Sequence, residues 1–326
     1  DVERSRGLGD VYKRQRCFPC GIKSTEYPCR NPKEHPEEYV ADTRCCEEIG
    51  CFFEDDDIDA VIIATRHGTH AKIASTSLLH GKDTFVEKPL AINTTQLKTV
   101  IDAYNKTNAR LMVGFNRRFS PFSIKAKNFI RGGNEPITIN MRINAGYIPR
   151  EHWVHDSFEG AGRVIGEVCH FVDLALYFTD SRPISVYASS ISNENYAIDD
   201  NIAAVVNFEN TSIANIFYVS NGDKAFSRER IELFGNRGVC VIDNFRKLIC
   251  TRGGVKKTDK KRFSIDRGHE NEFKIFFESI KNGKDIPVSF DDYVLTTLVT
   301  FKINESIRKG KLVNVSLDEL NMREQI

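Results

Sequence analysis

The sequence lacks any long apolar run and any excess of charge of one sign. Its apolar runs, such as AVIIA and IAAVVNF, fall far short of the roughly 20 residues of a membrane-spanning helix. The first residues, DVERSRGLGDVYKRQ, contain no apolar signal core. Lys and Arg number 46 against 45 Asp and Glu. Because the chain has no overall basic field to attract polyanions, we expect neither a nucleic-acid partner nor a membrane partner. The short apolar runs and the missing signal core lead us to expect a cytoplasmic location.

The cysteines lack the spacing of a metal site. Six of the nine lie within the first 51 residues, where Cys17 and Cys20 form a Cys-x-x-Cys pair. A structural zinc site needs a second pair of similarly spaced ligands, and none follows. An odd count in a long chain also argues against a disulfide framework. We therefore expect no metal, and we interpret Cys169 as a packing residue.

A regular α/β pattern begins at Asp57. Continuous apolar runs predict three strands, at 58–65, 84–88 and 109–115. Helical spacing of apolar residues predicts two helices between them, at 70–82 and 94–108. Because each crossover helix must pack back on the sheet, this alternation predicts a parallel sheet with helices on its faces.

The pattern changes after Pro121. A helix, a strand at 137–145 and an apolar segment at 162–179 precede five successive strands separated by turn residues, and two amphipathic helices follow at 268–282 and 290–309. We expect an α+β domain with an open, mainly antiparallel sheet. The predicted domains are 54–120 and 121–326, and the basic run 253–262 is expected to be a solvated hairpin.

An opening strand and a complete glycine turn are missing. Residues 1–39 contain no apolar run of four, and Gly7 and Gly9 supply only half of a Gly-x-Gly-x-x-Gly turn, with Tyr12 in the third position. The stretch SRGLGDVYKRQ resembles a translated sequencing-adapter scar, and the residues up to about Gly50 resemble a misread frame. We expect residues 1–53 to be irregular.

Polar residues follow each of the three predicted strands. They occur in ATRHGTH (64–70), VEKPL (86–90) and GFNRRFSP (114–121). Because the carboxyl ends of parallel strands line one crevice, these residues should face a common ligand. Pro89 disfavours a helical conformation for Lys88 and keeps its ammonium group over the crevice. A solvated Lys88 paired with Glu87 is the alternative interpretation.

Together these three stretches resemble the Gfo/Idh/MocA family of nicotinamide-dependent oxidoreductases, over residues 54 to about 310. The resemblance implies a Rossmann-type dinucleotide-binding domain and places Lys88 beside the nicotinamide and the substrate. It implies that the cofactor is NAD or NADP. In the family, the residue that ends the second strand selects between the two, and that strand cannot be recognised in this sequence. The cofactor contacts that it implies are Thr65, His67, His70, Glu87, Lys88, Pro89, Asn116 and Arg118.

GAGRVIGEVCHFVDL (160–174) resembles the family's second catalytic segment, a helix that reads Asp-x-x-x-His-x-x-Asp. His170 and Asp173 match the histidine and the final aspartate, whereas Gly166 stands at the first aspartate with Glu167 next to it. Histidine with an ordinary pKa of about 6.5 is suited to accept a hydroxyl proton near neutral pH. We expect His170 to move the proton, with Asp173 or Glu167 in support. A hydrogen-bonded core histidine is the alternative.

Substrate contacts are expected from His152 and Trp153 in the loop GYIPREHWVHD and from Arg163, which follows that loop. Imidazole and indole groups suit hydroxyl contacts and stacking on a sugar ring, although an exposed polar hairpin would have the same composition.

The predicted function is a dehydrogenase that transfers a hydride between NAD or NADP and a secondary alcohol of a sugar, cyclitol or nucleotide sugar. An NAD-dependent glycoside hydrolase and a non-catalytic ligand-binding homologue are the alternatives. The resemblance implies a homodimer or homotetramer formed through the open face of the antiparallel sheet, where incomplete alternation leaves apolar side chains. Without an opening strand and glycine turn, the chain is expected to bind its cofactor weakly.

Overall fold

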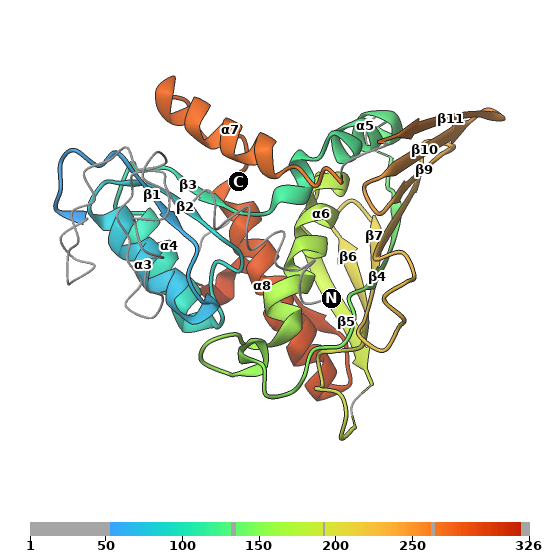
Figure 1. Ribbon diagram of the computed structural model, residues 1–326, viewed down its shortest axis with the longest axis horizontal. Helices are drawn as coiled ribbons and strands as arrows, with labels where there is room; N and C mark the ends of the chain where they lie inside the picture. Colours follow the sequence, from blue (N-terminus) through green and yellow to red (C-terminus); the bar gives the residue numbers. More distant parts are fainter. Residues whose placement is uncertain (1–52, 132–134, 192, 262–264, 321–326) are drawn as a thin grey trace, which may run out of the picture.

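The computed structural model describes residues 53–131, 135–191, 193–261 and 265–320, arranged as a small sheet and a large sheet with helices between them (Figure 1). The Cys-x-x-Cys pair, the partial glycine turn and nearly all of the segment 1–53 lie outside the described residues. Among the described helices, none has both the length and the apolarity that crossing a bilayer requires.

The small sheet is the predicted parallel α/β unit. Its strands pair side by side in the order β1 (Ala60–Ile63), β2 (Asp83–Val86) and β3 (Leu111–Val113). The crossovers are α3 (His67–Leu79) and α4 (Thr94–Tyr104). The Asn93 side chain accepts a hydrogen bond of 2.9 Å from the Gln96 N–H, which satisfies one free donor at the start of α4.

The large sheet has nine strands in the order β11-β10-β9-β8-β4-β7-β6-β5-β12. Neighbours are antiparallel, as predicted, except that β4 runs parallel to β7. Because β4 comes from far earlier in the chain and inserts between β7 and β8, local sequence could not indicate this pairing. The strands are β4 (Thr138–Asn144), β5 (Pro183–Ser190), β6 (Ile202–Phe208), β7 (Ile213–Val219), β8 (Glu229–Gly235), β9 (Gly238–Asp243), β10 (Lys247–Arg252), β11 (Val255–Lys260) and β12 (Val313–Asn314).

Helices cover one face of the large sheet. α5 (Pro121–Ile130) packs on β8, β9 and β10, and α8 (Phe290–Lys309) packs on β5 and on α6 (Cys169–Thr179). α7 (His269–Lys281) lies against the turn η4 (Asn116–Phe119) that follows β3. The sequence predicted these helices closely. It did not predict strands at β10 or β12. The run 253–262, predicted to be a solvated hairpin, contains the turn and the exposed strand β11, which pairs with β10.

The opposite face of the large sheet exposes apolar side chains. Five of them on β5, β7 and β8 are each more than two-fifths exposed: Ile184, Tyr187, Ile213, Phe217 and Phe234. Antiparallel sheets commonly leave one face to solvent, but that face is then usually polar.

Two consecutive arginines in η4, the turn that follows β3, form buried ion pairs with β8 of the large sheet and with α6. Arg117 donates two hydrogen bonds of 3.0 Å to the Glu229 carboxylate on β8. Arg118 donates to both oxygens of Asp173 on α6, at 3.0 and 2.5 Å. The Arg118 and Asp173 side chains are 5% and 0% exposed, so this pair is nearly sealed from water.

We expect Arg118→Ala to destabilise the fold by about 3–5 kcal/mol, because it leaves the buried Asp173 carboxylate without its counter-charge. Lys125→Ala is the matched control. Its partner is Asp259, and both side chains are more than half exposed, so its loss should cost less than about 1 kcal/mol. Urea denaturation measures both free energies of unfolding. Equal losses would show that the buried pair between η4 and α6 does not stabilise the fold more than an exposed pair does.

Candidate active site

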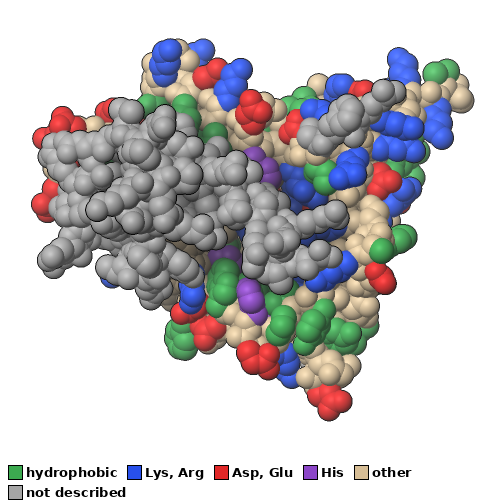
Figure 2. All heavy atoms as spheres, viewed as in Figure 1, with side chains coloured by type: hydrophobic (Ala, Val, Ile, Leu, Met, Phe, Trp, Pro, Cys, Tyr) green, Lys and Arg blue, Asp and Glu red, His purple; other side chains and the backbone are tan. Residues whose placement is uncertain are grey.

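A cavity of about 390 Å³ opens at the carboxyl ends of the small sheet's strands. Lys88, Asn116 and His170 all line it, so their predicted convergence is confirmed. Figure 2 shows histidine side chains beside Lys and Arg in the hollow between the two halves of the molecule. The lining described residues are Ala64, Thr65, His67, His70, Glu87, Lys88, Asn116, Arg117, His170, Arg228, Glu229, Arg267 and His269.

Lys88 reaches across this cavity from the end of β2. Its ammonium group donates a hydrogen bond of 2.9 Å to the Gly166 carbonyl oxygen, in the segment that leads into α6. The Lys88–Pro89 peptide bond is cis. An ammonium group has three N–H donors, so Lys88 can hold Gly166 and still donate to a bound oxygen.

His170 is an uncharged base in this site. Its side chain is buried, and burial together with the positive charges of Arg117 and Lys88 holds its pKa well below 6.5. Its Nδ1 atom is buried and has no hydrogen-bond partner among the described residues. The ring therefore stays neutral at neutral pH, which supports an acceptor role over that of a core histidine held by structural hydrogen bonds.

The segment before α6 is a short π-helix, η6 (Val164–Val168), and there the backbone approaches α3 closely. A Cβ added to Gly166 would lie 2.6 Å from Cε1 of His67. π-helical turns insert an extra residue into a helix and alter which side chains share a face. The close approach of His67 explains why glycine, and no carboxylate, occupies this position.

Glu167 and Asp173 were predicted to support His170, but both carboxylates bond elsewhere. Glu167 accepts a hydrogen bond of 2.7 Å from the Tyr218 hydroxyl and one of 3.3 Å from Arg163. Asp173 is bound by Arg118. Burial raises the pKa of Asp173 to about 6 even with that partner. These contacts argue against a direct role for either residue in orienting His170.

The two histidines of α3 join segments of the chain around the cavity. His67 Nδ1 lies 2.8 Å from the Gly160 carbonyl oxygen, and burial lowers the His67 pKa to about 3. The two ring nitrogens of His70 lie 2.8 and 2.9 Å from the carbonyl oxygens of Pro89 and Thr65. Burial also lowers the His70 pKa. His70 thus connects two of the polar stretches that follow strands.

The remaining predicted cofactor contacts divide into two groups. Thr65, Glu87 and Asn116 line the cavity, and Asn116 donates a 3.0 Å hydrogen bond to the Arg267 carbonyl oxygen. Pro89 and Arg118 are not among the described lining residues. The Pro89 carbonyl oxygen lies 2.8 Å from His70 Nδ1, and Asp173 holds Arg118 in the core. Contacts of these two residues with the cofactor stay predictions.

None of the three predicted substrate residues is among the described residues that line the cavity. Trp153 packs edge-on against His67, with ring centroids 4.9 Å apart. The His152 side chain accepts a hydrogen bond from the Val154 N–H. Arg163 is 1% exposed and donates to the Gly146 carbonyl oxygen. Contacts of these three side chains with a substrate stay predictions.

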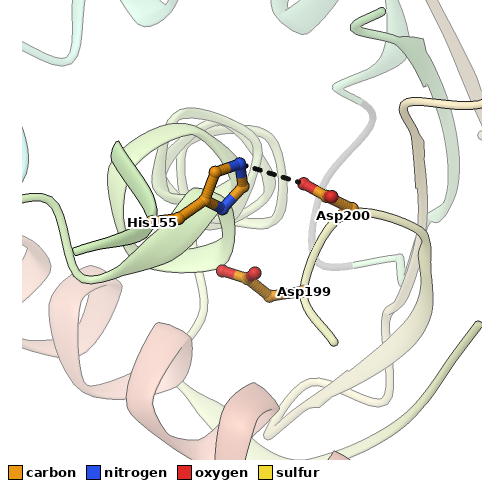
Figure 3. Close-up of side chains that lie close together, drawn as sticks. All are labelled: His155, Asp199 and Asp200. Atoms are coloured by element: carbon orange, nitrogen blue, oxygen red, sulfur yellow. Dashed lines mark ion pairs between the residues drawn. The ribbon is translucent and has the colours of Figure 1, made fainter. Parts of the chain in front are cut away.

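His155, at the end of this loop, lies close to the buried carboxylates of Asp199 and Asp200 (Figure 3). His155 Nε2 lies 3.8 Å from an Asp200 oxygen, and Arg163 Nη1 lies 3.8 Å from the same atom. Asp199 accepts backbone hydrogen bonds of 2.5 and 3.2 Å from Arg163 and Val164. These residue types also ligate metals. Burial and the neighbouring Asp200 raise the pKa of Asp199, and Asp200 Oδ1 and both ring nitrogens of His155 have no hydrogen-bond partner among the described residues. The expected absence of a metal therefore stays a prediction.

Sequence analysis missed four residues of the cavity wall: Arg228, Glu229, Arg267 and His269. They come from the start of β8 and from the segment that enters α7. No motif marks them, since only the fold brings these two places to the strand ends. Their charge dominates this wall, and three of the four carry a formal charge.

The described residues fit the nicotinamide end of a dinucleotide. Thr65, Lys88 and Asn116 stand at the carboxyl ends of three parallel strands, which is where α/β sheets bind such ligands. The neutral His170 with its unpartnered buried Nδ1 atom adds an acceptor beside them.

We expect Gly166→Ala to destabilise the protein by about 1–3 kcal/mol, because the new methyl group overlaps a buried ring that is held on two sides. The His67→Ala background removes that ring and provides the control. There the cost of Gly166→Ala should fall, and thermal denaturation of the four variants in a double-mutant cycle measures the coupling. Additive effects would show that His67 does not restrict position 166.

Comparison with known proteins places this geometry in a family. Residues 30–115 match the profile "Oxidoreductase family, NAD-binding Rossmann fold", and residues 125–241 match the "GFO/IDH/MocA C-terminal domain". An inositol 2-dehydrogenase of Rhizobium meliloti is 27% identical over 281 residues, which are 80% of this chain and 82% of that one. The fold is similar to that of an NAD binding oxidoreductase from Klebsiella pneumoniae (TM-score 0.73, 19% identity, 83% of each chain). It is also similar to that of levoglucosan dehydrogenase in complex with NADH and levoglucosan (TM-score 0.71, 22% identity, 83% of each chain). The chain therefore belongs to the Gfo/Idh/MocA family of oxidoreductases.

Proposed function

We propose that this protein is an NAD(P)-dependent dehydrogenase that oxidises a secondary alcohol of a cyclitol or sugar to a ketone, or reduces the ketone. The convergence of Lys88 and the neutral His170 at the strand ends of an NAD-binding domain carries this proposal. The relatives support the substrate class, since one is named for inositol and another was solved with levoglucosan.

The two side chains have complementary tasks. The Lys88 ammonium group donates a hydrogen bond to the alcohol oxygen and stabilises the negative charge that develops there. The neutral His170 imidazole accepts the hydroxyl proton. Its low pKa keeps it unprotonated over the neutral range, so it is ready to accept at every turnover.

The nicotinamide supplies the hydride chemistry when it is bound. Lys88, Thr65 and Asn116 would hold the nicotinamide end, from the ends of the three strands. Choice of NAD or NADP, the domain boundaries at residues 54 and 121 and a cytoplasmic location stay predictions.

Lys88→Ala and His170→Ala should each lower kcat by about 10²–10⁴-fold, the usual effect of removing a positioned acid or base. Absorbance of NADH or NADPH during oxidation of inositols and sugars measures this at saturating cofactor. Lys72→Ala and His80→Ala remove exposed side chains of the same types and should leave kcat unchanged. In the unmodified protein, no acid limb should appear near pH 6.5, because the His170 pKa lies well below that value.

Full activity in both variants would refute the assignment of the site. Release of an aglycone from a glycoside without net NADH would favour the NAD-dependent hydrolase instead. Cofactor binding without turnover of any polyol would favour a ligand-binding protein.

We further propose that the exposed apolar face of the large sheet joins two or four copies of the chain. Ile213 and Phe217 on β7 and Tyr187 on β5 are each more than two-fifths exposed on this face. Exposed apolar side chains that share one face of a sheet mark interaction surfaces in soluble proteins.

We expect a dimer or tetramer at micromolar concentration, measured by light scattering. Phe217→Asp should shift the protein towards the monomer, because it places a charge in the apolar contact. Phe158→Asp, which also replaces an exposed phenylalanine but lies in the loop before η6, is the control. A monodisperse monomer before mutation would contradict the proposal.

A further inference from the structure

The cavity wall carries more positive than negative charge. Among the described lining residues, four are cationic (Lys88, Arg117, Arg228 and Arg267) and two are acidic (Glu87 and Glu229). The four lining histidines do not change this balance at neutral pH, because burial lowers the pKa of each: His67, His70, His170 and His269.

Carboxylates behind the wall do not neutralise the excess. Glu272 is buried beside Glu87, and burial with that neighbouring charge raises its pKa well above the ordinary value, which disfavours a second negative charge there. Glu167 is shared by Arg163, the Tyr218 hydroxyl and, at 3.4 Å, Arg228. A neutral sugar would leave the excess of positive charge in a partly desolvated cavity, which costs free energy.

One carboxylate serves three guanidinium groups. Glu229 accepts both hydrogen bonds of the Arg117 fork at 3.0 Å and one of 3.1 Å from Arg267. Arg228 Nε lies 3.8 Å from the same carboxylate. Glu229 is 1% exposed, and these cations lower its pKa to about 2. It is therefore ionised and fully used by Arg117 and Arg267.

Arg228 retains donor capacity towards the cavity. Its closest carboxylate contacts are 3.4 Å to Glu167 and 3.8 Å to Glu229, both longer than a good charged hydrogen bond. Its side chain is 49% exposed. Arg267, in the same wall, donates from Nε to Glu229, and its Nη2 atom lies 3.5 Å from Asn244 Oδ1.

Both arginines come from the C-terminal domain, whereas Lys88 and Asn116 come from the strand ends of the small sheet. A group bound by Arg228 and Arg267 would lie at the wall that these two segments form. Guanidinium forks bind planar carboxylates and phosphates with two parallel hydrogen bonds.

We propose that the substrate is a polyol or sugar that bears an anionic substituent, a carboxylate or a phosphate, and that Arg228 and Arg267 bind this substituent while its alcohol lies at Lys88 and His170. This inference rests on the proposed dehydrogenase function and narrows its substrate class. Arg228 is the specificity-determining residue, because its guanidinium group is the most exposed of the three around Glu229.

Pairs of probes that differ at one terminal group, neutral in one member and anionic in the other, test the proposal: D-glucitol with D-gluconate, D-galactose with D-galacturonate, and D-glucose with D-glucose 6-phosphate. Calorimetry measures binding to the full chain with cofactor present, and NADH or NADPH formation measures turnover. The anionic member of at least one pair should bind at least about tenfold more tightly, and added NaCl should reduce the difference. The carboxylate and phosphate pairs distinguish the two anions.

Arg228→Gln should reduce the anionic-to-neutral ratio of kcat/KM by at least about tenfold, and Arg228→Lys should restore part of it. Arg230→Gln is the control, because Arg230 lies two residues along β8 and pairs with Glu232 away from the cavity. Melting temperatures establish that each variant is folded.

Three outcomes would overturn the proposal. They are equal binding of both members of every pair, equal loss for both members in Arg228→Gln, and a weaker affinity for the cofactor alone in that variant, which would assign Arg228 to the dinucleotide. Oxidation of neutral substrates alone would sink this inference and leave the dehydrogenase function intact. Absence of turnover with every probe, together with selective binding of the anionic members, would instead refute the dehydrogenase function.

Discussion

Two buried ion pairs, both formed by arginines of the turn η4, join the small parallel sheet to the rest of the structure. Arg117 and Arg118 follow the third parallel strand, and each enters the other half of the molecule to meet one carboxylate, Glu229 on β8 or Asp173 on α6. A buried charge that loses its partner is strongly destabilising, so each pair fixes the position of the element that carries its carboxylate. The cavity exists because both elements are held against the ends of the parallel strands.

That burial also determines the protonation of the site. Removal from water disfavours charged imidazole, and the neighbouring Arg117 and Lys88 act in the same direction, so His170 is neutral. Lys88 remains tied to the Gly166 carbonyl oxygen across the cavity. A cation that donates and an uncharged ring that accepts therefore face one space, which is the arrangement that removal of a hydroxyl proton requires.

The same packing withdraws several residues from chemistry. Arg118 and Asp173 neutralise each other in the core, and Glu167 is shared by Arg163 and Tyr218. Trp153 supports the loop through its contact with His67. Arg118, Glu167 and Asp173 belong to stretches that resemble functional segments of the family, so membership of a motif did not distinguish a reacting group from its scaffold.

The sequence by itself determined the parallel α/β unit and most helices, because apolar periodicity is local, and it brought Lys88 and Asn116 to one crevice, because strand ends share one edge of a sheet. The prediction for His170 depended on the resemblance to the Gfo/Idh/MocA family. Only the tertiary structure decided that β4 inserts beside β7 and that Arg228 and Arg267 form the opposite wall. Hydrogen-bond partners and desolvation depend on residues far apart in the chain. Local pattern therefore indicated which side chains reach the cavity from the strands, and the fold alone decided their charges and their partners.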